Sequence, residues 1–378
     1  MLKLLYYPTD AGAPDDYGDS VDRLLDGADK EIQTFRKATD SFIPPAKALI
    51  DTVEAWLKAR PLSATPPVVM VHGYMFDPRD QNDTGPDSPF GSVYGETPPI
   101  VHNMSWLPLV GADPVAFSYK SIAGFLEFGR AGWTNSYQHA VFDLAPQAAR
   151  ALASVLAVLG ARVPRYRILA HSLGTRTTSL ALRLLLGAGL KAPERVVLLD
   201  GAEFSVDACV SFKNCQFDVF NIVNSADTIL QIGATQMCHP LRETARVPSC
   251  VVGIDGLGTN PRWMDLQLDN AALSAWLAGG NAPTNRAYAI DPDAQENSHS
   301  VAWLRHWSCY TNDGNRELVR DLLLDDRMTV AALKNLDAPS GSDSPSTMLF
   351  ENQPIPPTPT SRSARSAMMA QTSTPPIS

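Results

Sequence analysis

Five short apolar runs, separated by segments of helical or irregular character, constrain the fold of this chain most. They lie at residues 68–71, 114–119, 166–170, 195–199 and 218–223. Strands that are apolar along their whole length have both faces buried, which is typical of parallel sheets covered by helices. The sequence therefore predicts an α/β fold with a mostly parallel central sheet and helices on both faces.

Helical patterns and composition divide the 378 residues into three parts. Residues 1–65 form a predicted N-terminal helical extension, broken into two helices at Pro44-Pro45. Residues 66–336 hold the apolar runs, with helices expected over 148–159 and 317–324 and a last strand at 287–290. Residues 337–378 are rich in Ser, Thr and Pro, and we expect this tail to be disordered because it has little apolar surface to bury.

Charge and cysteine usage exclude some classes of partner and compartment. The net charge is −9 and only 19% of residues are charged, which argues against a nucleic-acid partner. No uninterrupted apolar run approaches the length of about 18 residues that predicts a transmembrane segment. The first apolar run is too short for a signal peptide. Five cysteines without a CxxC pair indicate reduced thiols in a cytoplasmic protein, with a Cys209–Cys215 bridge as the alternative.

A short motif, Ala170-His171-Ser172-Leu173-Gly174, lies between one apolar run and a helical pattern. A strand, a sharp turn with a serine at its tip and a helix are the context of a nucleophile elbow. Small residues two positions before and after the serine let the strand end pack against the helix start. Serine is also a favoured helix N-cap, but this context favours Ser172 as a nucleophile.

Stabilisation of an oxyanion requires two backbone donors near that serine. Leu173 follows the nucleophile, so its N–H lies at the start of the helix. The run at 68–71 ends in His72-Gly73, where glycine allows a close approach of the backbone to a substrate. We therefore predict the N–H groups of Leu173 and Tyr74 as the donors.

Two carboxylates compete for the role of orienting acid. Asp227 follows the run at 218–223, and it could also cap a helix that begins at Thr228. Asp200, with Glu203 close by, follows the run at 195–199, one strand early in the expected order. We favour Asp227.

Two histidines, His299 and His306, lie between the last expected strand and the final helix. We favour His306 as the general base because its aromatic neighbours could exclude water from the imidazole. The chain order is then Ser172, Asp227, His306.

With these residues, the sequence resembles the α/β-hydrolase superfamily in its lipase- and esterase-like branch. The resemblance covers about residues 66–335 and makes 66–336 the catalytic domain. It implies a mostly parallel eight-stranded sheet, a catalytic triad at the carboxyl ends of the strands, and no metal or organic cofactor. It also implies a serine hydrolase that cleaves small-molecule or lipid esters. An acyltransferase with the same triad, or an inactive binding protein on this scaffold, are the alternatives. No protein partner is indicated.

Three other features have structural interpretations. Asp77, Asp80, Asp83 and Asp87 lack the spacing of a calcium loop, so we expect a solvated loop. The glycine-rich segment 253–258 does not follow a phosphate-binding pattern, so we expect a loop there. Four tryptophans fall in the region expected to cover the site, where core packing explains them, although an acyl-chain pocket is possible: Trp263, Trp276, Trp303 and Trp307.

Overall fold

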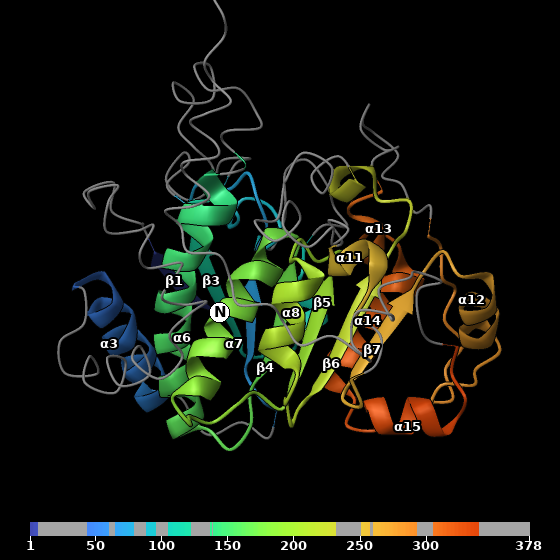
Figure 1. Ribbon diagram of the computed structural model, residues 1–378. Helices are drawn as coiled ribbons and strands as arrows, with labels where there is room; N and C mark the ends of the chain where they lie inside the picture. The colour runs from blue at the N-terminus through green and yellow to red at the C-terminus, as the bar shows by residue number, and fades with distance from the viewer. Residues whose placement is uncertain are drawn as a thin grey trace, which may run out of the picture.

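The protein is an α/β structure with a single seven-stranded parallel sheet in the part of the chain that is described (Figure 1). This computed structural model describes residues 1–6, 44–59, 65–78, 88–95, 105–121, 137, 139–231, 251–257, 260–292 and 305–339. The strand order is β1-β3-β2-β4-β5-β6-β7, and every neighbouring pair is parallel. The strands are β1 (Leu2–Tyr6), β2 (Val68–Val71), β3 (Pro114–Tyr119), β4 (Arg167–His171), β5 (Arg195–Leu199), β6 (Asp218–Val223) and β7 (Trp263–Gln267).

Helices cover both faces of this sheet, as the fully apolar strands require. One face carries α3 (Pro44–Ala59), α6 (Ala145–Arg162), α7 (Leu173–Gly187) and α8 (Ser205–Phe212). The other face carries α4 (Leu107–Val110), α14 (Asp313–Leu324) and α15 (Val330–Asn335). The remaining elements are η2 (Ala140–Leu144), α11 (Val252–Asp255), α12 (Ala271–Ala278) and α13 (Ser308–Thr311). The alternation within β2 shows the division: Val69 and Val71 belong to the first core, Val68 and Met70 to the second.

All five predicted strands are confirmed, and so are helices at both predicted positions, in α6 and α14. Three predictions are wrong. Residues 2–6 form an edge strand paired with β3, so the N-terminal segment is not wholly helical. Residues 287–290 are not a strand, because the Tyr288 N–H bonds to the carbonyl of Leu277 at the end of α12 instead of to a strand. The segment 253–258 is not wholly a loop, since it begins within α11. Residues 7–43 and 340–378 lie outside the described part.

The last long helix is fixed to the sheet by arginines at the beginnings of two neighbouring strands. Arg167 donates to the carbonyl of Leu323 at 2.7 Å, and Arg195 donates to that of Leu322 at 2.7 Å. The carbonyls at a helix C-terminus lack intrahelical partners, and cations there are favourable. These bonds fix the C-terminal end of α14, the helix that follows the His306 segment in the chain.

One described helical stretch, Ala140–Arg162, is long and apolar enough to cross a membrane by length and composition. However, 78% of its most apolar window is buried inside the protein, where it packs on the sheet and on α7. This is the environment of a core helix.

Candidate active site

Ser172 occupies a strained turn between β4 and α7. Its backbone has φ 52° and ψ −126°, a conformation that non-glycine residues rarely adopt and that concentrates at functional sites. The turn is held by main-chain bonds: the Ser172 N–H donates to Leu199 O at 3.0 Å, and its carbonyl accepts from Ala202 N at 2.9 Å. The Ser172 side chain makes no capping bond to α7. The hydroxyl is therefore not used as a helix cap.

The two small positions of the motif are not equivalent. A Cβ added to Gly174 would lie 2.4 Å from the carbonyl oxygen of Val71 and 2.5 Å from that of His72. These are backbone atoms of β2 and its loop, which cannot move away from a methyl group. Ala170 is fully buried in β4 and packs its methyl group in the core. Only the second position after the serine, Gly174, requires glycine, which explains why alanine is accepted at 170.

This asymmetry gives a stability prediction. Gly174→Ala should lower the free energy of unfolding by about 3 kcal/mol, because overpacking against backbone cannot relax. The matched change Ala170→Gly should cost only about 1 kcal/mol, from backbone entropy and a lost methyl contact. Urea unfolding of both variants measures the difference. Equal losses in the two variants would contradict the packing explanation.

The predicted acid and base are in direct contact. His306 Nδ1 donates to Asp227 Oδ2 at 2.6 Å, although the two residues are 79 positions apart. Asp227 is fully buried and His306 nearly so. A carboxylate only accepts hydrogen bonds, so Nδ1 carries the proton and the lone pair of the neutral ring is on Nε2. Asp227 also accepts from Leu230 N–H through Oδ1 at 3.0 Å. The aspartate thus both caps a turn and orients the imidazole.

The rival acids have other surroundings. Asp200 is fully buried after β5, and neither of its carboxyl oxygens bonds to a nitrogen or oxygen in the described part. Burial, and then the charge of Asp227, raise the pKa of Asp200 well above its usual value, which favours a protonated carboxyl. Glu203 instead forms a buried ion pair at 2.6 Å with Arg176 of α7. Of the two candidate acids, Asp227 is the one whose carboxylate contacts His306 in the described part of the chain.

The loop after β2 lies directly against the serine. A Cβ on Gly73 would be 2.8 Å from Ser172 Cβ and 3.3 Å from Ser172 Oγ, so glycine is required by this close approach. The buried ring of His72 holds the loop: Nε2 accepts from Tyr119 N at 3.1 Å and Nδ1 donates to Gly73 O at 2.9 Å. Burial lowers the pKa of His72 to about 3, so this ring is neutral. His72 therefore has a structural role, in which its hydrogen bonds hold the loop after β2 in place.

Both residues predicted as oxyanion donors therefore belong to segments that touch Ser172. Leu173 is the first residue of α7, where backbone N–H groups have no intrahelical partner. Tyr74 follows Gly73, and its ring packs edge-on against Tyr137 with centroids 5.1 Å apart.

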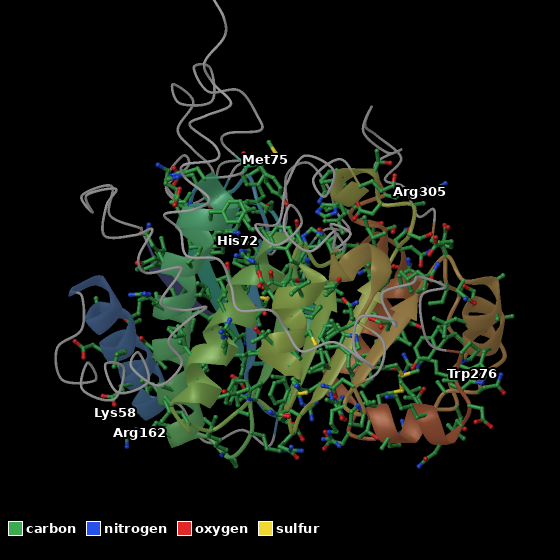
Figure 2. All side chains as sticks on the ribbon, in the orientation of Figure 1. Lys58, His72, Met75, Arg162, Trp276 and Arg305 are labelled. Atoms are coloured by element: carbon green, nitrogen blue, oxygen red, sulfur yellow. The ribbon has the colours of Figure 1, made fainter. Side chains whose placement is uncertain are left out.

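Backbone strain flanks the site on both sides. Met75, after Tyr74, has φ 73°, and Arg305, before His306, has φ 54°. Figure 2 shows both residues on the side of the molecule where the strands end, with His72 deeper inside. Met75 is 51% exposed, so this loop reaches the surface within three residues of the buried His72. Residues held in this region of φ cluster at ligand sites, which supports a site between these two segments.

The expected hydrogen bond between Ser172 and His306, which are both described, is not formed in this structure. Within the described residues, no hydrogen bond joins the Ser172 hydroxyl to the ring of His306. The two residues are linked through His171, whose ring centroid lies 4.7 Å from that of His306. Catalytic hydrogen bonds are often long before substrate binds. The rival base His299 lies outside the described residues.

Sequence reasoning missed two polar residues that hold the His306 segment. His171 Nε2 bonds to the His306 carbonyl at 3.0 Å, and Asn224 Nδ2 donates to Ser308 Oγ at 2.9 Å. Both are buried, and each follows or ends a strand beside a predicted site residue. The available signal was their position, since His171 adjoins Ser172 and Asn224 lies three residues before Asp227, but their partners are more than 80 residues away.

The tryptophans near the site differ in position. Trp263 is a fully buried core residue of β7, as the core-packing interpretation predicts. Trp307 packs edge-on against His306 with centroids 5.7 Å apart, as an aromatic neighbour of the base should. Trp303 lies outside the described part, as do Asp80, Asp83 and Asp87.

Cys209 and Cys215 are free thiols. The described residues contain no group of three or more His, Cys, Asp or Glu side chains suited to hold a metal ion.

Comparison with known proteins adds no relative: no protein-family model, curated protein or solved structure matches this chain.

Proposed function

We propose that this protein is a serine hydrolase with an α/β-hydrolase fold. The observation that carries the proposal is the 2.6 Å hydrogen bond between His306 and Asp227, a residue that follows the carboxyl end of β6 as Ser172 follows that of β4. A nucleophile on a strained turn, an imidazole and a buried carboxylate, in this chain order, are the parts that acyl transfer needs. The parallel sheet has seven described strands where the resemblance implies eight.

The proposed reaction is the hydrolysis of carboxylic esters. His306 Nε2 takes the hydroxyl proton as Ser172 Oγ attacks the acyl carbon, and the carbonyl electron pair moves to its oxygen. Asp227 holds the imidazole in the required tautomer and stabilises the imidazolium. The N–H groups of Leu173 and Tyr74 stabilise the oxyanion.

Collapse of the tetrahedral intermediate breaks the ester C–O bond, and the imidazolium protonates the leaving alcohol. Water, deprotonated by the same imidazole, then attacks the acyl-enzyme and releases the acid and the free serine. The neutral, buried Asp200 is not part of this cycle.

A panel of p-nitrophenyl esters with short to medium acyl chains tests the proposal. We expect turnover of at least one ester, with equal amounts of free acid and p-nitrophenol released. The same assay with an added alcohol measures acyl transfer: a new ester as the main product would assign a transferase instead. No turnover of any ester, together with no covalent labelling of Ser172, would contradict hydrolysis and favour a binding protein on this scaffold.

A further inference from the structure

His171, the last residue of β4, is bonded to the main chain of the base. Its Nε2 lies 3.0 Å from the carbonyl oxygen of His306, and the two ring centroids are 4.7 Å apart. A carbonyl oxygen only accepts, so Nε2 carries the proton and donates it. The donor is on the residue that immediately precedes Ser172. One side chain therefore connects the nucleophile turn to the segment that carries the base.

Aromatic rings fix the orientation of this imidazole. Tyr310 packs edge-on against His171 at 5.2 Å between centroids, and Trp106 does so at 6.1 Å. Trp106 and Tyr310 also contact each other edge-on at 5.7 Å. With only 4% of its surface exposed, His171 has little freedom to turn. The hydrogen bond is thus made by a rigid donor, which loses little side-chain entropy on forming it.

The ring of His171 is uncharged. Burial, and then the charge of the neighbouring His306, lower the pKa of His171 well below its usual value. A neutral ring satisfies the carbonyl through Nε2 and places no positive charge beside His306. This matters because His306 becomes an imidazolium during the proposed reaction, and a second cation at 4.7 Å would oppose that step.

The main chain of His306 itself needs an attachment, because the Asn224 bond holds Ser308, two residues further on. Asp227 holds only the ring of His306, through Nδ1. The main chain enters from Arg305, which has a strained left-handed backbone. We propose that His171 is a positioning residue, which fixes the His306 main chain relative to Ser172 and so sets the distance between base and nucleophile. This inference rests on the proposed function.

Substitution at 171 tests it in the full chain. His171→Phe keeps a planar ring but removes the donor, and we expect kcat for ester hydrolysis to fall about tenfold, the value of one buried hydrogen bond. KM should stay within about twofold, because ground-state binding is unchanged. His171→Gln places an amide N–H near the Nε2 position and should recover most of the lost kcat. Tyr166→Phe is the control, since it removes a partly buried bond to the Lys191 carbonyl from the residue just before the other end of β4.

The outcomes separate positioning from packing. A His171→Phe enzyme with the wild-type kcat, or a His171→Gln enzyme as slow as the phenylalanine variant, would overturn the inference. If His171→Phe does not fold, His171→Asn replaces it: its shorter amide cannot reach the carbonyl, so it must be slower than the glutamine variant. Ser172→Ala distinguishes failure of the proposed function from failure of this inference. If that variant stays active the proposed function fails, whereas an inactive Ser172→Ala beside a fully active His171→Phe refutes only the inference.

Discussion

Ser172→Ala is expected to lower kcat for ester hydrolysis by on the order of 10⁴ to 10⁶. The alanine has no oxygen to form the acyl-enzyme, so only oxyanion stabilisation and substrate binding remain. The measurement is turnover of the best ester from the panel. The variant and the wild type are purified in parallel, so that activity from a trace contaminant would appear in both preparations.

The fold should survive this change. Ser172 is held by its own main chain, through bonds to Leu199 and Ala202, and its side chain caps nothing. Thermal unfolding of Ser172→Ala should therefore match that of the wild type. Ser179→Ala is the matched control: it removes another buried hydroxyl, seven residues later on α7, that has no hydrogen-bond partner in the described part. It should retain wild-type kcat. A large loss in Ser179→Ala would mean that disruption of α7 is enough to explain inactivity.

The second large effect is expected at the base. His306→Ala should reduce kcat by on the order of 10⁴ or more, because the hydroxyl then has no group to accept its proton. His299→Ala should stay within about threefold of wild type, because a histidine that takes no part in the proton transfer contributes little to turnover. The same ester assay on both variants decides between the two histidines.

A double variant that combines Ser172→Ala with His306→Ala gives a further test of the proposed triad. Residues that act as a unit have non-additive effects, so Ser172→Ala/His306→Ala should be no slower than the slower single variant. Two losses that multiply would show that the residues act independently. Loss of activity in His299→Ala, with an active His306→Ala, would assign the base to the other histidine.

The strands of the sheet were predictable where they are continuous apolar runs. The prediction failed for the strands that are not. β7 contains Asp265 and Gln267 among its five residues, so it does not read as a buried strand. Its Asp265 is nevertheless buried, because it accepts hydrogen bonds from the nearby Trp263 and Leu257 and from Asn221, which only the fold brings close. β1 is a short run at the start of the chain, and its partner β3 is more than 100 residues away. Local patterns carry no information on such pairings.

The candidate site shows the same division. The elbow was predictable because strand, serine, glycine and helix are adjacent in the chain. The acid and the base come from separate loops, so the sequence left a pair of candidates for each. The contact between Asp227 and His306 supports Asp227 as the proposed acid, and it depends on the parallel order of β4, β5 and β6. The supports at His171 and Asn224 bond to distant residues and could not be found by spacing.

The central claim is that the hydroxyl of Ser172 is made nucleophilic by its surroundings, and covalent labelling with a fluorophosphonate tests it most directly. Such a reagent phosphonylates an activated serine and leaves ordinary serines unmodified. Digestion and mass spectrometry of the labelled wild-type protein should place one adduct on Ser172, with labelling strongly reduced in His306→Ala. An unlabelled protein, or an adduct on another serine, would contradict the account.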